Sequence, residues 1–377
     1  MKKKLSFLFV LLFILSLFSL LGFAESDKPE KIVSGDWEYQ ALDDGTVSIC
    51  GYNGNTEEVV IPDTLDGMTV SRIGERAFCW HAELKRIAIP DSVKIIEGRA
   101  FLFCEGLISI EIPDSVTDIG DHAFASCQSL TDIMLPERLT TIGECAFGEC
   151  NGLERITIPD GVTSIPGNPF ARCESLSEIV VSPDHPYLQV VDGALFSKPD
   201  MRLISYPCSS SATECSIPQG TRIIGNYAFD RCKDLTSIII PDDVVSIGES
   251  AFRGCKNLTD IILPPNVSFL GDSVFAYCSN LSHINIPNGV EKIGVWAFID
   301  CAKLSSIAIP DGVTDIGMSA FARCFSLTDV VIPESVINIE PLAFLDCYEI
   351  KSVHVSRGSV AEKYCKDNAL PCVYDDE

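Results

Sequence analysis

The chain has 377 residues, of which 46% are hydrophobic, and a formal net charge of −25 at pH 7. The apolar content is ample for a continuous buried core. The negative charge argues against nucleic acid and anionic lipid as partners, because both would be repelled.

The first 24 residues have the pattern of a secretory signal. Three lysines at positions 2–4 precede an apolar run from Leu5 to Leu21, and Gly22-Phe23-Ala24 offers small residues where signal peptidase reads. We therefore expect residues 1–24 to be a signal peptide, a secreted or cell-surface location, and no membrane span after cleavage. An uncleaved membrane anchor is the alternative, since the apolar run approaches a bilayer span.

Residues 25–60 are expected to form a linker and an N-terminal β cap. Residues Trp37 to Leu42 and Thr46 to Cys50 alternate around Asp43-Asp44-Gly45, which predicts a hairpin. Residues 57–61 supply a further strand. Such a cap would shield the exposed edge of the first coil that follows.

After this cap the chain repeats itself every 23 residues in two runs, one up to Pro159 and one from Pro218. Phenylalanine recurs in step with proline, which occupies Pro90, Pro113, Pro136, Pro159, Pro218, Pro241, Pro264, Pro287, Pro310 and Pro333. A fixed period of this size predicts a solenoid of stacked coils and falls within the leucine-rich range.

The unit at residues 112–134 shows how one coil is expected to fold. In residues 130–135 the apolar positions Ile133 and Leu135 alternate at the end of the segment and predict a short strand, which Pro136 ends. Residues 116–119 return apolar groups to the interior, and residues 121–130 have the spacing of a helical turn. About a dozen stacked coils would then form a parallel sheet on one face and helical turns on the other.

This repeat resembles the BspA-like, or Treponema pallidum-type, leucine-rich repeat family. The resemblance rests on L-x-x-I-x-I-P-x-x-V-x-x-I-G-x-x-A-F-x-x-C across roughly residues 36–374. It implies an α/β repeat solenoid, a right-handed superhelix of 23-residue coils with a β-hairpin N-terminal cap and a short helical C-terminal cap. Members are mainly secreted or cell-surface proteins, and those studied are adhesins or bind host proteins. The resemblance therefore implies binding without naming a ligand.

The solenoid is expected to span residues 61–355, with one longer repeat at 182–217. Within that repeat, residues 194–197 and 202–206 flank Lys198-Pro199-Asp200, which predicts an inserted hairpin. Residues 356–377 are expected to form the C-terminal cap, with helical spacing over 359–368 and a final strand at 371–374.

Ten of the 17 cysteines occupy one repeat position: Cys104, Cys127, Cys150, Cys173, Cys232, Cys255, Cys278, Cys301, Cys324 and Cys347. We expect them to be free, buried thiols that serve as small hydrophobes, with disulfides between stacked neighbours as the alternative. For the pairs Cys208–Cys215 and Cys365–Cys372, a disulfide and two free thiols fit the sequence equally well.

The outward residues of the strands should form two rows on the sheet face, where the scaffold does not dictate side-chain identity. From these rows we predict the ligand-binding residues Met134, Thr157, Val180, Ile239, Ile262, Asn285, Asp132, Arg155, Glu178, Asp260 and His283. Val180, Ile239 and Ile262 are expected to form an exposed apolar cluster. Such a cluster is either a protein-binding patch or a consequence of β-propensity.

No catalytic residue, metal site or cofactor is expected. The sequence has no H-E-x-x-H, G-x-S-x-G or C-x-x-C motif. His122 and Cys145 occupy equivalent positions of adjacent coils, where an imidazole can lower a thiol pKa, yet no third residue orients them. The acidic residues that follow the prolines are explained by turn chemistry, with calcium between coils as the less favoured alternative.

The expected function is a secreted or cell-surface, non-enzymatic interaction protein. It would bind an extracellular protein or glycan through the strand face, in the manner of an adhesin. The first alternative is a structural or matrix surface protein without a specific ligand, and an enzyme is the third hypothesis.

Overall fold

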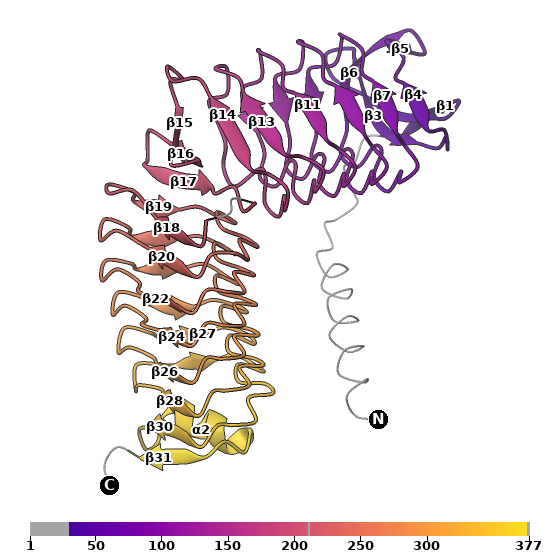
Figure 1. The fold of residues 1–377 in the computed structure, drawn as a ribbon. Helices are drawn as coiled ribbons and strands as arrows, with labels where there is room; N and C mark the ends of the chain where they lie inside the picture. The colour runs from indigo at the N-terminus through magenta and orange to yellow at the C-terminus, as the bar shows by residue number, and fades with distance from the viewer. Residues whose placement is uncertain (1–29, 210–211, 375–377) are drawn as a thin grey trace.

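The computed structural model describes residues 30–209 and 212–374. The chain winds into a solenoid of stacked coils with two arms that meet at a corner (Figure 1). The predicted repeat solenoid is confirmed, whereas the predicted signal peptide lies outside the described residues. Within the described ranges, no helix has the length and apolar character needed to cross a membrane.

The N-terminal cap is an antiparallel meander that leads into the first coils. Its strands are β1 (Ile32–Ser34), β2 (Trp37–Ala41), β3 (Val47–Tyr52), β4 (Glu58–Val60), β5 (Thr64–Leu65) and β6 (Met68–Ile73). β2 and β3 form the predicted hairpin, and β3 then pairs in parallel with β6. The Tyr39 hydroxyl donates a 2.7 Å hydrogen bond to Asp66, which ties the cap to the first coil.

Each regular coil contributes two short strands. The first strands form the surface that we call the strand face: β7 (Arg86–Ala88), β9 (Ser109–Glu111), β11 (Asp132–Met134), β13 (Arg155–Ile158), β14 (Glu178–Val181), β18 (Glu214–Ser216), β20 (Ser237–Ile239), β22 (Asp260–Ile261), β24 (His283–Ile284), β26 (Ser306–Ala308), β28 (Asp329–Val331) and β30 (Ser352–Val355). The second strands follow the proline turn: β8 (Ile95–Ile96), β10 (Asp118–Ile119), β12 (Thr141–Ile142), β19 (Ile223–Ile224), β21 (Ser246–Ile247), β23 (Phe269–Leu270), β25 (Lys292–Ile293), β27 (Asp315–Ile316) and β29 (Asn338–Ile339). Equivalent residues pair in parallel, as Ile133 does with Ile110, so identical side chains stack from coil to coil.

The third side of each coil is a ladder of tight turns, where the sequence spacing had indicated a helical turn. In one coil, His122 and Ser126 have φ angles of 56° and 60°, and these left-handed residues interrupt an α-helix. The Phe124 amide donates to the carbonyl of Ala146 in the next coil at 2.7 Å. Hydrogen bonds between coils therefore hold this side together, as they hold the strands.

The repeat glycine permits this close stacking. A Cβ placed on Gly120 would lie 2.6 Å from the backbone nitrogen of Gly98 in the neighbouring coil, which is nearer than two such atoms can pack. A side chain at Gly120 would push this coil away from its neighbour, although Glu97 and Glu340 stand at the same position in two other coils.

Stacked phenylalanine rings run through the core of each arm. The ring centroids of Phe101, Phe124 and Phe147 follow one another at 5.1 and 5.4 Å. The buried hydrophobic residues form two clusters, one from Tyr39 to Ile204 and one from Ala194 to Cys365. The interior is therefore interrupted once, at the long repeat, and is not a single uninterrupted stack.

The long repeat adds three strands: β15 (Leu188–Val191), β16 (Ala194–Ser197) and β17 (Arg202–Ser205). β16 and β17 form the predicted hairpin, and β15 extends it into an antiparallel sheet. β17 then pairs in parallel with β19, the second strand of the next coil. The insertion therefore lengthens the solenoid on this side.

The turn side receives only the partial coil that contains Tyr206. The Asn168 amide donates to the Asn226 carbonyl at 3.4 Å, and the Asn168 side chain donates to the Tyr227 carbonyl at 2.8 Å. The last coil before the insertion thus stacks directly on the first coil after it. The extra strands lengthen one side of the solenoid more than the other. This difference bends the solenoid axis and accounts for the corner between the two arms (Figure 1).

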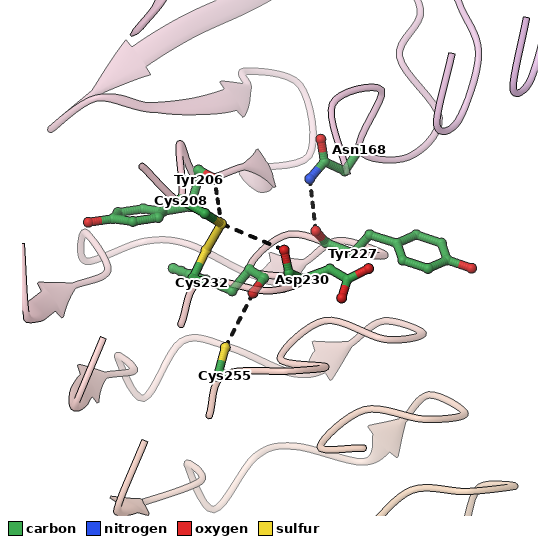
Figure 2. Close-up of a disulfide and its surroundings, with 8 residues drawn as sticks. Asn168, Tyr206, Cys208, Tyr227, Asp230, Cys232 and Cys255 are labelled. Carbon is green, nitrogen blue, oxygen red and sulfur yellow. Dashed lines mark hydrogen bonds between the residues drawn. A yellow bond between two sulfur atoms is a disulfide. The ribbon is translucent and has the colours of Figure 1, made fainter. Parts of the chain in front are cut away.

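A disulfide joins Cys208 to Cys232 beside this corner (Figure 2). Tyr206 occupies the place of a repeat phenylalanine and stacks on Phe229 with centroids 5.1 Å apart, which brings Cys208 next to Cys232. The other 15 cysteines are free. The expectation of a free thiol is wrong for Cys232, and the disulfide considered between Cys208 and Cys215 does not form.

The C-terminal cap consists of α2 (Val360–Asp367) and β31 (Cys372–Tyr374). The Ser359 side chain accepts a 3.1 Å hydrogen bond from the Glu362 amide at the start of α2, as an N-cap residue does. β31 pairs in parallel with β30 and covers the edge of the last coil. The predicted short helical cap is confirmed, and Cys365 and Cys372 are free thiols.

Candidate functional site

The predicted binding residues all belong to the strand face or its edge. Ten of the eleven are exposed, and Val180 is half-buried. Nine of them line three shallow grooves, one on the N-terminal arm and two on the C-terminal arm. The remaining two, Val180 and Glu178, lie on β14 beside the corner.

The apolar part of the strand face centres on Ile239 and Ile262, which lie one coil apart. Their exposed fractions are 63% and 76%. A groove of about 320 Å³ runs along both side chains and is edged by Asp242 and Asp260. A second groove, of about 350 Å³, lies on the other side of Ile262 and reaches His283. We call these five residues the isoleucine groove.

The surroundings of the isoleucine groove are acidic. The two outward rows from residue 214 to residue 354 contain Glu214, Asp260 and Asp329 but no lysine or arginine. Hydrogen bonds from Ser352 and Thr328 lower the pKa of Asp329, which keeps this carboxylate charged at neutral pH. The strand face of the C-terminal arm therefore combines exposed apolar side chains with an excess of negative charge.

The groove on the N-terminal arm has a different character. It has a volume of about 450 Å³ and is lined by the predicted residues Asp132, Met134, Arg155 and Thr157. Met134 is 76% exposed and is its main outward apolar side chain. Arg155 forms a 3.3 Å ion pair with Glu178 in the next coil. Part of the charge in this groove is therefore already paired within the scaffold.

Two predicted residues have surroundings that their spacing did not reveal. Val180 lies in β14, which pairs only with β13, whereas Ile239 lies in the separate sheet of β18 and β20. The groove that joins Ile239 to Ile262 does not include Val180, and the long repeat lies between Val180 and Ile239 in the chain, so the cluster of all three residues stays a prediction. The Asn285 side chain accepts from the Leu263 amide and donates to the Leu263 carbonyl, both at 3.0 Å. These two side-chain hydrogen bonds take the place of a pair of backbone hydrogen bonds between neighbouring strands.

The residues at the rim of the isoleucine groove were not among the predicted binding residues. Asp242, Pro264 and Pro265 line it together with Ile239 and Ile262, yet they had been read only as turn residues. A signal was present, because Pro265 stands where most coils have an acidic residue after the proline. This coil therefore presents an apolar edge beside Ile262.

The surroundings of His122 and Cys145 do not favour a reactive thiol. Burial raises the pKa of the Cys145 thiol, and burial lowers the pKa of His122. Both shifts favour the neutral forms, whereas a nucleophilic cysteine requires the thiolate. In the part of the chain that the structure describes, no group of three or more His, Cys, Asp or Glu residues is arranged to hold a metal ion.

Comparisons with known proteins agree with this architecture. A family model described as a BspA type leucine rich repeat region matches residues 50–197, 205–325 and 271–367. A leucine rich cell surface protein of Faecalibacterium prausnitzii is 28% identical, with a TM-score of 0.58, over 92% of this chain and 98% of its own. A leucine-rich repeat protein of Eubacterium ventriosum is 24% identical, with a TM-score of 0.65, over 85% of this chain and 90% of its own.

The pneumococcal vaccine antigen PcpA has the same fold at 20% identity, with a TM-score of 0.58, over 93% of this chain and all of its own, 100%. No curated protein sequence matches. The family model covers most of the described chain, and the repeat period, the stacked phenylalanines and the paired parallel strands extend through both arms. The chain therefore belongs to the BspA-type leucine-rich repeat family.

Proposed function

We propose that the chain is a secreted or cell-surface, non-enzymatic interaction protein that binds a partner protein, in the manner of an adhesin, through the isoleucine groove. The signal pattern in residues 1–24 supports export. The description of the Faecalibacterium prausnitzii relative as a cell surface protein supports the same location. The repeat scaffold supports binding, because it presents a long surface whose outward residues are free to vary.

The exposure of Ile239 and Ile262 is the observation that carries this proposal. Neighbouring coils have small or polar residues at the same outward position, including Ser216, Asn285 and Ala308, so the scaffold itself does not require isoleucine there. Two adjacent side chains that are 63% and 76% exposed leave apolar area in contact with water. Covering such a side chain fully is worth about 1.5–3 kcal/mol.

The charge around the groove indicates what the partner segment contains. An apolar side chain would fill the groove, and lysine or arginine residues on either side would face Asp242 and Asp260. Attraction of this kind accelerates association and weakens as salt screens it. A neutral glycan offers neither the aliphatic side chain nor the positive charge.

The test is selection from a random peptide display library against the mature protein, followed by affinity measurement of the enriched peptides. We expect enrichment of sequences in which an aliphatic or aromatic residue lies beside lysine or arginine. The double variant Ile239→Thr and Ile262→Thr keeps β-branched side chains and should weaken binding by at least about tenfold, since even partial loss of two buried side chains exceeds 1.4 kcal/mol.

Ile337→Thr is the matched control, because Ile337 is 69% exposed on the same arm but lies outside the groove. Equal affinity of the double variant and the wild type would contradict the proposal. So would enrichment of peptides without basic residues, or saturable binding on a glycan array that the double variant retains. Self-association without any saturable partner would favour the structural hypothesis.

A further inference from the structure

A basic hollow lies at the corner, on the turn side of the solenoid. It has a volume of about 370 Å³, and its lining includes Arg231, Lys233, Arg253, Lys256 and Tyr277 from the C-terminal arm. Glu174, from the last coil of the N-terminal arm, completes it. Four cationic side chains thus converge on one hollow in a chain whose net charge is −25.

Stacking explains how these charges meet. Glu174, Lys233 and Lys256 each follow the repeat cysteine directly, so they occupy the same place in three coils stacked across the corner. The fold does not require charge at this place, because Ser279 and Ala302 occupy it in the next two coils. Lysines on adjacent coils repel each other, and the scaffold gains nothing from that repulsion.

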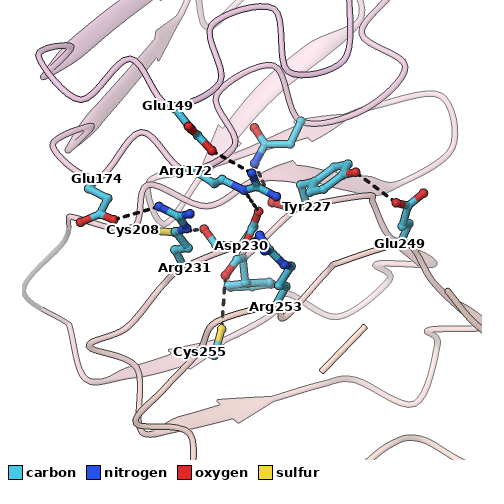
Figure 3. A network of polar contacts seen from close by, with 12 residues as sticks. Glu149, Arg172, Glu174, Cys208, Tyr227, Asp230, Arg231, Glu249, Arg253 and Cys255 are labelled. Atoms are coloured by element: carbon cyan, nitrogen blue, oxygen red, sulfur yellow. Dashed lines mark hydrogen bonds and ion pairs between the residues drawn. The ribbon is translucent and has the colours of Figure 1, made fainter. Parts of the chain in front are cut away.

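The acidic groups nearby leave part of this charge uncompensated. Glu174 lies 3.4 Å from Arg231 (Figure 3). It also lies 3.3 Å from Lys233, so one carboxylate serves two cations. The buried Asp230 accepts a 2.7 Å hydrogen bond from Arg172, and Arg172 also donates to Glu149 at 2.8 Å. Together the network holds five cations, Arg172, Arg231, Lys233, Arg253 and Lys256, and three anions, Glu149, Glu174 and Asp230, which is an excess of two positive charges (5 − 3).

Arg253 shares its acidic partner with Arg172. Its guanidinium lies 3.7 Å from Asp230, whose carboxylate is already paired with Arg172. The Nη1 atom of Arg253 is buried and faces the Oδ1 atom of Asp230, and at 3.7 Å the two are too far apart for a hydrogen bond, so each lacks a hydrogen-bond partner among the described residues. The group is held 5.2 Å above the Tyr277 ring. Arg253 lines the hollow, and its guanidinium has five N–H donors, so it keeps donors for an anion there.

We propose that this hollow binds a small tetrahedral oxyanion, a sulfate or phosphate group, either free or as the terminal ester of a small molecule. Two guanidinium groups can donate in pairs to its oxygens, and two ammonium groups add point charge. The site is separate from the isoleucine groove and does not depend on the function proposed for it.

Isothermal titration of the mature protein with sodium sulfate, at fixed ionic strength in chloride, tests this proposal. We expect one saturable site that inorganic phosphate competes for. The double variant Lys233→Gln and Lys256→Gln should bind at least about tenfold more weakly, because it removes two charges within several Å of the anion. Glu174→Gln, which removes the one carboxylate among the described lining residues, should bind sulfate more tightly.

Lys303→Gln is the control for general loss of charge, since Lys303 is exposed on the same arm and does not line the hollow. It should leave the sulfate affinity unchanged. Thermal unfolding provides a second readout, and sulfate should raise the Tm of the wild type but not that of the double lysine variant. The proposal is overturned by the absence of saturable binding, by equal affinity in the double variant, or by an equal loss in Lys303→Gln.

Discussion

The repeat cysteine serves this fold as a small buried group with a weak donor. Its Sγ atom donates to a phenylalanine carbonyl one coil back, as Cys127 does to Phe101 at 3.3 Å and Cys150 does to Phe124 at 3.2 Å. Burial raises the pKa of Cys104, Cys173 and Cys278 to about 12. At neutral pH these thiols are therefore neutral, and their role is packing.

Alkylation followed by mass spectrometry checks this role. At pH 8, the 11 buried free cysteines should stay unmodified in the native protein, because they are inaccessible to the reagent. The four half-exposed ones, Cys50, Cys79, Cys215 and Cys372, should react first. Denaturation should expose all 15 free thiols, and reduction should add Cys208 and Cys232. Native labelling of Cys150 as fast as Cys50 would contradict the assignment.

The disulfide between Cys208 and Cys232 could not be predicted from the repeat position of Cys232 alone. Ten cysteines share one repeat position, and all ten were expected to be free, buried thiols. Cys232 differs because Tyr206, in the incomplete coil above it, takes the place of a repeat phenylalanine and brings Cys208 into reach. An aromatic residue two positions before Cys208 was visible in the sequence, but its equivalence to the phenylalanines was not, because the insertion had broken the period.

At the scale of elements, strands were predicted better than turns. A strand follows from alternation alone, whereas the turn side depends on backbone angles. The apolar spacing over residues 121–130 fits a helix, yet His122 and Ser126 adopt left-handed angles. Each coil gains hydrogen bonds to the next coil in place of helical ones, and this gain exists only once the coils are stacked.

The C-terminal cap contains the one α-helix among the described residues, and Glu362 anchors it. Its carboxylate accepts hydrogen bonds from Lys366 and the Gly358 amide, both at 2.7 Å, and from the Tyr374 hydroxyl at 2.8 Å. Lys366, the Gly358 amide and Tyr374, in that order of effect, lower the pKa of Glu362 to about 2. The cap therefore favours the ionised form of this group.

This pKa predicts a pH-dependent cap. A lowered pKa in the folded state stabilises the cap above the ordinary glutamate value of 4.5, and the effect is lost as pH falls toward about 2. Glu362→Gln should speed amide exchange in residues 360–374 severalfold at pH 7. The ratio of the variant rate to the wild-type rate should approach one as pH falls through that window. A ratio that does not change with pH, or an equal effect from Glu349→Gln, would contradict the prediction.

At the scale of the whole molecule, the corner is the feature that the sequence predicted least. The inserted hairpin was predicted, but its effect depends on the turn side passing directly from Asn168 to Asn226. Arg172 and Asp230, which meet across the corner, are 58 residues apart and follow no period. By contrast, the neighbouring positions of Ile239 and Ile262 on one groove follow from the 23-residue period.

Asp230 is the charge on which the corner depends. Its side chain is fully buried, with 0% exposure, between Arg172 of one arm and Arg253 of the other. Burial raises the pKa of Asp230, while Arg172 and Arg253 oppose that shift. Asp230→Asn keeps the shape but removes the anion between two guanidinium groups, of which, among the described residues, only Arg172 retains a carboxylate partner, Glu149. Breaking a buried pair in this way costs about 3 kcal/mol or more.

We expect Asp230→Asn to lower the urea concentration at which the protein first unfolds and to broaden the distance distribution from small-angle X-ray scattering, because the arms are no longer fixed to each other. Asp300→Asn is the control, since Asp300 pairs with Arg323 at 3.1 Å within one arm. It should unfold slightly earlier while its scattering profile stays that of the wild type. Identical scattering from Asp230→Asn and the wild type would mean that the backbone contacts of Asn168, and not the buried charge, hold the two arms at their angle.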